Sequence, residues 1–510
     1  LSEEGLTLFD PMNDTVTYLI DNCGKLVHTW HSNYRPGNSV YLLENGNLIR
    51  TCRGVEENIA FDRPGAGGRV EILDWDSNVL WSYLFSNDTL LQHHDIEPLP
   101  NGNILVLAWD LMTFEQAIAA GRREDLLPDS ALWPEQVIEV EPVGSDQINE
   151  VWRWRFQNHL IQDFDASKGN FGVVSDHPEL VDINQVNTDG DADWIHANSV
   201  AYNHDRDEIV ISSRTLSEVF VIDHSTTTAE AATHSGGAKG KGGDFLYRWG
   251  NPENYGRGTA NDRTLFGQHD AHWIQSGHLD EGKLIVFNNG RNRTPFECTS
   301  VEIIDPPLDM NGGYGIEGNS AFGPIANNWE YQHVETDTFF ASFISGAEQL
   351  RNGNVLICDG PAGTLFEVTP SGDLAWEYIV PVNGNGPIQQ GVSPNGNLVF
   401  RARRYPLDYP GLVGDLTPGD PIEANPSSYN CTVEYLSVQD ADPIMFEVFP
   451  NPTTGVVSIM GLGSYNLELI DLTGKIVLTQ QIESNAQLDL SNLSSGIYNL
   501  RLRTETNEIQ

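Results

Sequence analysis

A short turn sequence recurs along this chain at intervals that few folds allow. Asn-Gly-Asn followed by an apolar segment occurs at residues 45–47, 101–103, 352–354 and 395–397, and related turns occur at 203–207 and 280–282. A second unit also recurs, in which an apolar segment and a polar turn precede an aromatic segment, as at Trp30, Trp81 and Trp376. This alternation predicts four short antiparallel strands per repeat. Six such repeats predict an all-β main domain that forms a six-bladed β-propeller.

The order of the repeats predicts how the ring closes. Residues 16–30 form an outer strand pair that no inner pair precedes, and residues 390–405 form an inner pair that no outer pair follows. We expect these N-terminal strands to complete the last blade, because an open ring would leave strand edges exposed. The predicted propeller domain spans residues 1–437. It has an insertion at about 110–180, with a helix from Thr113 to Arg122, and a flexible polar loop at 226–243.

Composition limits the partners of such a chain. It has 28 Lys and Arg against 72 Asp and Glu, a formal net charge of −44. This acidic excess disfavours nucleic-acid binding, which needs basic side chains, and favours solubility. No apolar run reaches transmembrane length. The five cysteines form no CxxC pair and define neither a zinc site nor a disulfide framework. The start at Leu1 is consistent with a signal peptide that was removed or left out.

Three histidines share one position in the repeats. In a propeller the innermost strand of each blade lines the central channel. We count back seven residues from each turn Asn, or use the matching local sequence for His269, to reach the entrance of that strand. The positions obtained are Asn38, His94, His196, His269, Ser345 and Ile388. We therefore expect three imidazoles from consecutive blades to meet at one point, as functional clusters do.

Two kinds of chemistry fit three converging imidazoles. They can hold a transition metal with an open position, or they can bind an oxyanion with a guanidinium while one imidazole acts as nucleophile. Arg214 follows the strand at 209–213, and we expect it to return to the channel mouth. A cation there disfavours a metal and favours an anion. Asn198, two residues after His196 on the same strand face, can donate an amide N–H.

The motifs around these residues resemble the arylsulfotransferase family of sulfotransferases that do not use PAPS. The resemblance spans about residues 5–405 and rests on the motifs Gln92–Asp95, Asp193–Ser199, Tyr247–Gly250 and Gln268–Ala271. It implies a six-bladed propeller that moves a sulfuryl group from an aryl sulfate donor to a phenolic acceptor. The resemblance also implies a sulfohistidine intermediate and no required cofactor.

The resemblance assigns roles by motif. His269 becomes the nucleophile, and its following Asp-Ala-His is expected to supply groups that orient its tautomer. His94, His196 and Arg214 become catalytic groups that bind the sulfuryl oxygens. The residues expected to contact the substrate are Asn198, Ser345 and Asn38. The remaining histidines, among them His159 and His234, fall on loops or outer strands and are predicted to be structural or exposed.

A separate module begins after a linker at residues 438–445. From residue 446, Phe449–Gly455 opens a run of alternating strands that continues through Leu467–Lys475 and Leu493–Tyr498. This tail resembles the C-terminal sorting domain of the type IX secretion system. The resemblance implies a small C-terminal β-sandwich at 446–510, recognition by the type IX machinery, and a secreted or surface-attached protein. The usual basic end does not follow Gln510, which implies an incomplete tail.

An acidic segment before His196 is a candidate calcium loop. Alternating oxygen ligands surround Gly190 in this segment, as in a calcium-binding loop. They are Asn187, Asp189, Asp191 and Asp193. The bidentate Glu of a full EF-hand is absent, and an acidic turn that shapes the approach to His196 explains the same residues.

Two other functions stay open at the level of the sequence. A non-catalytic secreted propeller would bind glycans or proteins through the loops of one face, with the histidines filling the channel. A metal-dependent hydrolase would use the three imidazoles as ligands. Arg214 argues against the metal, and the matched motifs argue against pure binding.

Overall fold

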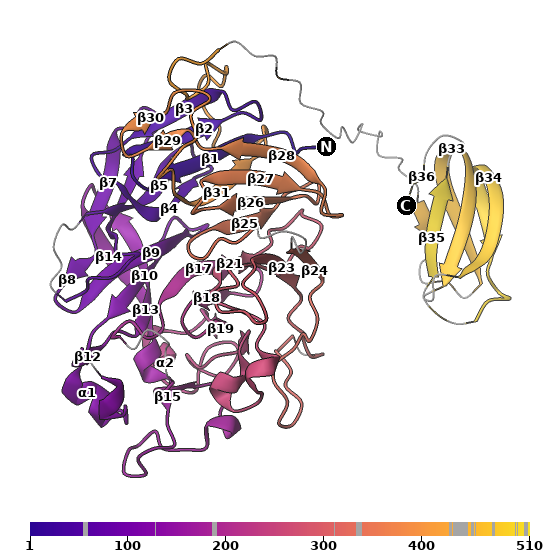
Figure 1. The fold of residues 1–510 in the computed structure, drawn as a ribbon. Helices are drawn as coiled ribbons and strands as arrows, with labels where there is room; N and C mark the ends of the chain where they lie inside the picture. Colours follow the sequence, from indigo (N-terminus) through magenta and orange to yellow (C-terminus); the bar gives the residue numbers. More distant parts are fainter. Residues whose placement is uncertain are drawn as a thin grey trace. The chain divides into compact units, whose positions relative to one another are not determined.

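The computed structural model divides into a unit at Leu1–Tyr435 and a unit at Leu436–Gln510 (Figure 1). It describes all residues except 55–59, 128, 186–190, 311, 333–338, 428–430, 432–446, 450–452, 454, 472–474, 495, 497, 504–507 and 510. The predicted linker at 438–445 therefore lies outside the described residues. The regular structure of the described part is almost entirely strand, with two short α-helices, α1 (Phe114–Ala119) and α2 (Thr228–Ala231).

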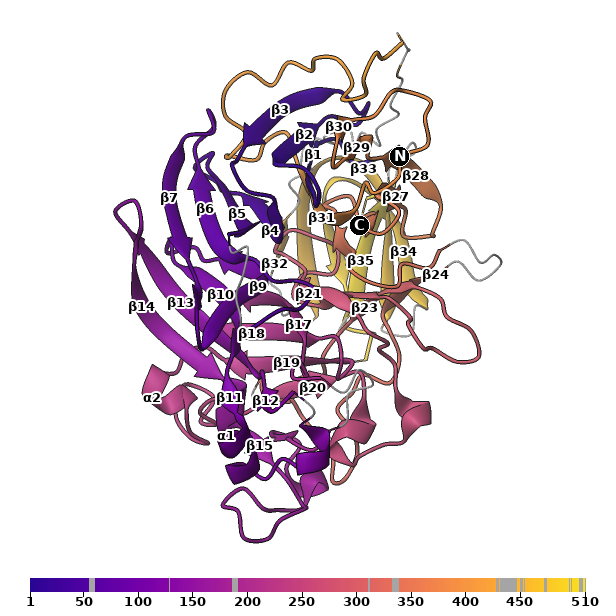
Figure 2. The ribbon, with the colours of Figure 1, turned by 60° about the vertical axis from the view of Figure 1, so that its left-hand side comes forward.

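Six antiparallel sheets follow one another around the first unit (Figures 1 and 2). From the innermost strand outward they are β4–β7 (Pro36–Leu42, Leu48–Arg53, Gly68–Leu73, Val79–Leu84), β9–β10–β13–β14 (Leu90–Pro98, Ile104–Asp110, Glu135–Val143, Gln147–Arg155), β17–β20 (Ala197–Asn203, Glu208–Ser213, Glu218–Asp223, Tyr247–Trp249), β21–β24 (His269–Trp273, Leu284–Asn288, Ser300–Ile304, Trp329–Gln332), β25–β28 (Gly346–Gln349, Val355–Asp359, Thr364–Val368, Leu374–Ile379) and β31–β1–β2–β3 (Val399–Tyr405, Leu6–Pro11, Val16–Ile20, Leu26–His31). Neighbouring innermost strands contact one another around the ring. The predicted six-bladed propeller is confirmed.

The recurring Asn-Gly-Asn turns close the inner hairpin of several blades. In the first, Asn45 Oδ1 accepts a hydrogen bond of 3.0 Å from the amide of Asn47, and Gly46 has a φ of 85°. Asn101 repeats this arrangement, and Gly102 has a φ of 87°. An Asn side chain that caps its own turn, followed by Gly in left-handed backbone, is the turn chemistry that joins two adjacent strands. The repeat therefore fixes where each inner strand begins.

The ring closes with strands from both ends of the first unit. β31 pairs with β1 in the register Leu6↔Tyr405, Leu8↔Arg403 and Phe9↔Ala402, and β1 continues into β2 and β3. The predicted meeting of residues 16–30 with the 390–405 segment is confirmed. The predicted division is wrong, because the N-terminus supplies three strands and the C-terminal segment only one. Ile388 consequently lies before the turn that leads into β31 and not on an innermost strand.

A disulfide joins the end of the first unit to the closing blade. Cys23, in the turn between β2 and β3, bonds to Cys431 with a Cα–Cα distance of 5.8 Å, while Cys52, Cys298 and Cys358 are free and buried. The cysteine spacing gives no sign of this pair, because 408 residues separate its members. A structural disulfide is typical of proteins in oxidising compartments.

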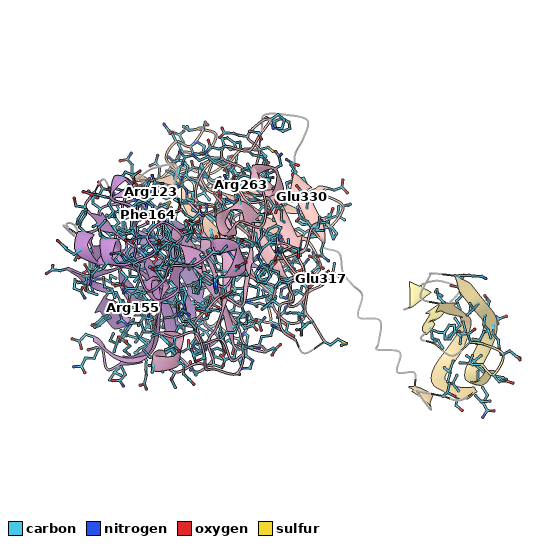
Figure 3. All side chains as sticks on the ribbon, turned by 90° about the horizontal axis from the view of Figure 1, so that it is seen from below. Arg123, Arg155, Phe164, Arg263, Glu317 and Glu330 are labelled. Atoms are coloured by element: carbon cyan, nitrogen blue, oxygen red, sulfur yellow. A yellow bond between two sulfur atoms is a disulfide. The ribbon has the colours of Figure 1, made fainter. Side chains whose placement is uncertain are left out.

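Two segments interrupt the blades. Helix α1 begins with a capping box between Thr113 and Gln116 and ends at Ala119, before the predicted Arg122, because Gly121 takes a φ of 86°. The predicted insertion at 110–180 is not continuous, since the outer strands β13 and β14 lie within it. The part of the insertion that follows β14 lies against the end of α1. There, Arg123 lies over the ring of Phe164 at 5.8 Å (Figure 3). The short pairs β11–β12 (Met112–Thr113, Ala131–Leu132), β15–β16 (Leu160–Ile161, Val181–Asp182) and β29–β30 (Val382–Asn383, Gly386–Pro387) and the edge strand β8 (Ser86–Asn87) complete the unit.

The second unit is built around one long strand. β33 (Val456–Asp471) pairs with β32 (Glu447–Phe449), β34 (Ile476–Asp489) and β35 (Tyr498–Arg503), and β36 (Glu508–Ile509) pairs with β35. Its small core contains Val457, Ile459, Leu467 and Leu488. The strands confirm a separate β module, and its arrangement as a sandwich stays a prediction. In the described part of the chain, no helix is long and apolar enough to cross a membrane.

Candidate active site

Apart from Ile388, the predicted ring residues lie near the start of the innermost strands or, for His94, at a bulge in the middle of β9. The side chains are almost fully buried, and only that of His196 exceeds 10% exposure, at 12%. Four of the residues take left-handed backbone: Asn38 (φ 136°), His94 (52°), His196 (46°) and Ser345 (86°). The pairing of the inner strands shifts register beside His94, His196 and His269. Bulges of this kind turn a side chain out of the sheet and are common next to active sites.

The ring histidines converge. The rings of His94 and His196 lie edge to face with centroids 4.9 Å apart. Phe400 on β31 lies 6.1 Å from the His94 ring and 6.3 Å from the His269 ring, so one side chain lies close to both. The amide of Arg214 donates to the carbonyl of His196 at 3.1 Å, which places the residue at the same end of the channel.

The tautomer of His269 is set by Asn289. The amide nitrogen of Asn289 donates to the carbonyls of Ala341 and Ile344 at 2.7 and 2.9 Å. Because carbonyls only accept, this fixes the orientation of the amide. The Asn289 Oδ1 must then accept from His269 Nδ1, 2.7 Å away. The Nε2 of His269 therefore carries the lone pair. The Asp-Ala-His motif does not orient this ring.

A carboxylate orients His196 in the same way. His196 Nδ1 lies 2.5 Å from Asp193 Oδ2, and the other Asp193 oxygen accepts from Trp109 Nε1 at 2.9 Å. This arrangement assigns the Nδ1 proton of His196 to the Asp193 side and leaves Nε2 for a ligand.

His94 ends a chain of three titratable groups. His94 Nδ1 and His93 Nδ1 are 2.8 Å apart, and His93 Nε2 lies 2.7 Å from Glu135 Oε2. The other Glu135 oxygen accepts from the amide of Ala197 at 2.8 Å. Two proton arrangements satisfy these contacts. With a Glu135 carboxylate, His94 presents a lone pair at Nε2; with a protonated Glu135, each imidazole shifts its proton and His94 presents an N–H.

The comparison with protein families identifies the propeller. Residues 2–382 match the family model described as Arylsulfotransferase (ASST). The chain belongs to the arylsulfotransferase family. Family membership supports a sulfotransferase activity. The match includes every ring residue from Asn38 to Ser345.

Of the other comparisons, only the match of the C-terminal tail supports a conclusion. Residues 447–510 of this arylsulfotransferase-family protein match the secretion system C-terminal sorting domain, which indicates export to the cell surface or the medium. No curated protein matches the chain. A solved structure of a protein of unknown function from Bacteroides caccae matches at 11% identity and a TM-score of 0.42, over 79% of this chain and 99% of that one. Virginiamycin B lyase from Staphylococcus aureus matches at 10% identity and a TM-score of 0.34, over 75% and 84%. Likenesses this distant carry no functional argument.

Burial keeps His94 and His269 of the arylsulfotransferase ring uncharged. It lowers the pKa of His269 to about 3, with Arg214 contributing, and holds the pKa of His94 well below its usual range together with the neighbouring imidazoles. Burial also lowers the pKa of His93 to about 3 and, with Asp193, raises the pKa of Glu135 well above its usual range. The imidazole of His269 is therefore neutral near pH 7, and its Nε2 lone pair is unprotonated. The guanidinium of Arg214 adds a positive charge near His94 and His269.

The closing strand ties two of the histidine-bearing strands together. Arg401 on β31 pairs with Asp95, next to His94, at 2.9 Å and with Asp270, next to His269, at 3.2 Å. Arg403, whose side chain is 12% exposed, pairs with Asp270 at 3.0 Å, while Arg401, Asp95 and Asp270 are buried. Burial alone raises the pKa of Asp270, but the two guanidinium groups more than offset this and hold it well below its usual range. Arg401 and Arg403 thus position the ring.

Replacing Arg401 with Met should destabilise the propeller by about 3–5 kcal/mol, because Asp95 loses its buried cation and Asp270 keeps only Arg403. Urea unfolding measures the change. Replacing Arg351 with Met is the matched control, since its pair with Asp408 is exposed (48% and 73%) and should contribute less than about 1 kcal/mol. Equal effects of the two substitutions would contradict the structural role of Arg401.

The three expected substrate contacts have different surroundings. Asn198 donates its amide to the carbonyl of Gln268 at 2.7 Å, while its own Oδ1 is buried without a hydrogen bond in the structure. The Ser345 hydroxyl already accepts from the amide of Gly360 at 3.0 Å and contacts the Phe343 carbonyl. Asn38 lies on β4 and is 4% exposed. Of the three, Asn198 is the one that contacts Gln268, the residue before His269.

The candidate calcium loop is only partly described. Asn187 and Asp189 lie outside the described residues. Asp191 pairs with Arg63 at 3.3 Å, and both oxygens of Asp193 face His196 and Trp109. Asp193 is therefore the partner of a ring histidine, and calcium binding stays a prediction.

Sequence reasoning missed three residues of this site. Asn289 directly follows β22, Glu135 begins β13, and Phe400 lies on the closing strand. The polar pair Asn288-Asn289 after an apolar strand is a usable signal for the first. Nothing in the sequence near Glu135 connects it with His93, since β10 lies between the two strands that carry them.

Proposed function

We propose that the protein is an exported sulfotransferase that moves a sulfuryl group from an aryl sulfate to a phenol through an intermediate on His269. The observation that carries this proposal is the Asn289 contact, which leaves a neutral Nε2 lone pair on His269 beside two imidazoles and Arg214. A neutral imidazole in a buried, cationic site suits nucleophilic attack on an anionic ester. The chemistry requires no cofactor.

The first half-reaction forms the intermediate. His269 Nε2 attacks sulfur, the S–O bond to the aryl group breaks with its electron pair, and the phenolate leaves. The sulfuryl group then rests on Nε2, while Nδ1 keeps its proton against Asn289. Arg214 and the second N–H of the Asn198 amide donate to the sulfuryl oxygens and stabilise their charge in the transition state, which is worth about 3–4 kcal/mol for one well-placed donor. His196 joins them through Nε2 in the form that carries a proton on both nitrogens, with its Nδ1–H held by Asp193.

The chain from His94 to Glu135 handles the proton. In its protonated arrangement, His94 gives the Nε2 proton to the leaving phenolate, and the proton of Glu135 follows through His93. In the second half-reaction the acceptor phenol returns a proton to His94 as its oxygen attacks sulfur. The S–N bond breaks, and His269 regains its lone pair. The proton released in the first step is the one recovered in the second, so the cycle balances.

Turnover of 4-nitrophenyl sulfate with and without phenol tests the function. Release of nitrophenol that depends on added phenol, with formation of phenyl sulfate, is the expected result. Release in water alone would indicate a hydrolase, and no release of nitrophenol under either condition would favour a binding propeller.

Replacing Glu135 with Gln should separate the two half-reactions. The new amide would donate to His93 Nε2, which fixes His93 Nδ1–H toward His94 and locks His94 as a donor at Nε2. The variant should release about one equivalent of nitrophenol and then transfer slowly, by roughly 10²–10⁴-fold, since it lacks a base for the acceptor. Pre-steady-state absorbance of nitrophenol, measured with the full-length protein at a single pH, gives the size of the burst.

The control for that variant is Glu150→Gln, because this carboxylate is 43% exposed and pairs with the nearby Arg153. Acceptors with low phenol pKa should rescue Glu135→Gln, as they ionise without a base. Equal loss of burst and turnover would show instead that Glu135 only supports the fold.

A further inference from the structure

A second group of titratable side chains lies away from the ring. His159 follows the short turn after β14, His234 follows α2, and Asp244 precedes β20. Among the described residues, these three form the one group of His, Cys, Asp and Glu side chains whose ligand atoms all lie within 4.8 Å of one another. None of them takes part in the sulfuryl chemistry proposed above.

The contacts of this group leave a lone pair facing a carboxylate. His159 Nε2 lies 2.9 Å from the carbonyl of Ala231, which can only accept, so Nε2 carries the proton. In a neutral ring, Nδ1 is then a lone pair, and it lies 2.8 Å from Asp244 Oδ1. His234 Nδ1 lies 2.8 Å from the same oxygen. Two acceptors at this distance require a positive charge between them, which is either an additional proton or a metal ion.

The residues that pack against His159 hold the group in place on the side away from solvent. His159 is fully buried and stacks on Trp154, with ring centroids 5.5 Å apart and planes at 6°. Gly243 is essential to this packing, because a Cβ there would lie 2.1 Å from the Ala231 carbonyl oxygen and 2.6 Å from His159 Nε2. A backbone carbonyl that accepts from the second nitrogen of a histidine is the usual support of a metal-bound imidazole.

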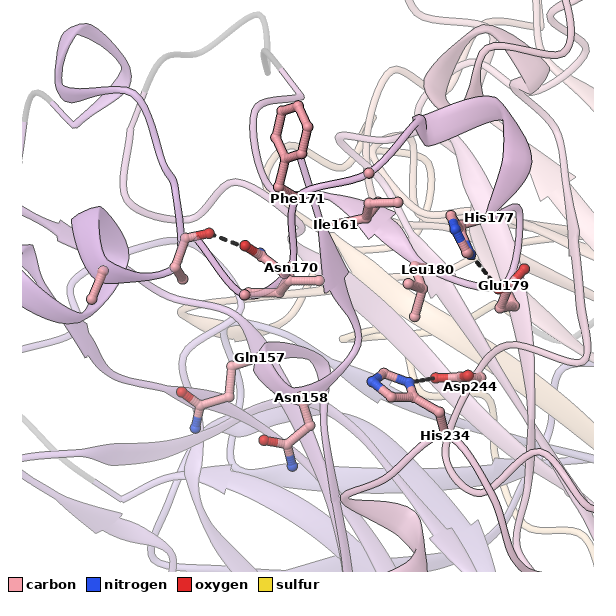
Figure 4. A pocket seen from close by; sticks show the side chains of 15 residues that line it. Gln157, Asn158, Ile161, Asn170, Phe171, His177, Glu179, Leu180, His234 and Asp244 are labelled. Carbon is pink, nitrogen blue, oxygen red and sulfur yellow. Dashed lines mark hydrogen bonds and ion pairs between the residues drawn. The ribbon is translucent and has the colours of Figure 1, made fainter. Parts of the chain in front are cut away.

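The front of the group opens into a pocket. The cavity measures about 630 Å³, and its lining includes His234, Asp244, His177 and Glu179 (Figure 4). His177 and Glu179 pair with each other at 2.9 Å. The side chain of His234 is 61% exposed, so it can move to accept an ion. A ligand entering from the pocket would complete the coordination of an ion held by the three side chains.

We propose that His159, His234 and Asp244 bind a zinc ion whose fourth position faces this pocket. Two imidazole nitrogens and one carboxylate oxygen, with one position left for solvent, are a common zinc set. Zinc holds such atoms at about 2.0–2.2 Å, so binding spreads the present contacts by roughly half an ångström. The ion ties the 226–243 loop, predicted to be flexible from its sequence, to the segment after β14.

Zinc content of the full-length protein tests the site. After removal of metal with a chelator and titration with Zn²⁺ alone, calorimetry and elemental analysis should find one tight ion that is lost in His234→Ala and in Asp244→Asn. The exposed position of His234 makes that variant the safer one for folding. Co²⁺ in place of Zn²⁺ should give the visible absorption of a four-coordinate ion, which the same variants remove.

Two control variants test whether the ion binds to this group or to other histidines. His269→Asn must keep the ion, because the ring imidazoles are the alternative ligands, and His204→Ala must keep it as an exposed histidine elsewhere (73% for the side chain). An unchanged ion count in His234→Ala would overturn the proposal. NMR signals from protons on both nitrogens of His159 at saturating Zn²⁺ would also overturn the proposal. They would show that a proton, and not zinc, lies between His159 Nδ1 and Asp244.

Discussion

His269→Asn should lower sulfuryl transfer by several orders of magnitude while leaving the fold intact. The replacement removes the Nε2 lone pair but keeps a polar side chain that can donate to Asn289. Loss of a covalent nucleophile is not compensated by its neighbours, because these groups act on an intermediate that no longer forms. Steady-state transfer from 4-nitrophenyl sulfate to phenol measures the loss, and the thermal midpoint reports the fold.

Mass spectrometry makes this prediction specific to one residue. Wild-type protein incubated with an aryl sulfate and no acceptor should carry one sulfuryl group on the peptide that contains His269, and the variant should carry none. His204→Asn is the matched control, since its side chain is exposed and outside the ring. An adduct on His94 or His196 would reassign the nucleophile. Full activity of His269→Asn would overturn the mechanism.

Deleting residues 1–12 should abolish cooperative folding of the propeller. The deletion removes β1, whose Leu6, Leu8 and Phe9 are at most 4% exposed. Burial of three such side chains is worth roughly 5–9 kcal/mol. It also removes Asp10, the buried partner of Arg50 at 3.0 Å, which costs about 3–5 kcal/mol more. The total matches the entire stability of an ordinary domain.

Differential scanning calorimetry measures the effect of this deletion. A chain that ends at residue 435 is the control, because the cut falls at the boundary of the two units and should leave the first thermal transition unchanged. A shortened chain with the midpoint of the full chain would show that β31 needs no partner. Addition of a synthetic peptide of residues 1–12 should restore the transition.

The ring could be predicted because its position is encoded locally. Three of the four Asn-Gly-Asn turns close the hairpin that begins at the ring, so a fixed count leads from Asn101 to His94. The same count fails at Ile388, because the turn at 395–397 precedes the lone strand β31 and closes no inner hairpin. Counting along the sequence cannot identify the side chains that contact these histidines. Asn289 and Glu135 reach the ring across neighbouring strands, and only the packed blades show which atoms meet.

The chain from His93 to Glu135 shows the same limit. The motif Gln92–Asp95 predicts that His94 faces the channel but gives His93 no role, since alternation sends it to the opposite side of the strand. The left-handed backbone at His94 breaks this alternation and lets the two rings share a 2.8 Å contact. A local departure from regular strand geometry thus creates a connection that regular geometry excludes.

The left-handed backbone at His94 and His196 also has a consequence for laboratory evolution. A residue with a Cβ at such an angle costs roughly 1–2 kcal/mol relative to glycine. Selection for heat resistance alone would favour glycine at both positions, and the survivors would withstand heat but lose two imidazoles that the proposed transfer requires. A library based on this propeller must therefore be sorted by product formed, because thermal robustness and turnover favour different residues at the channel mouth.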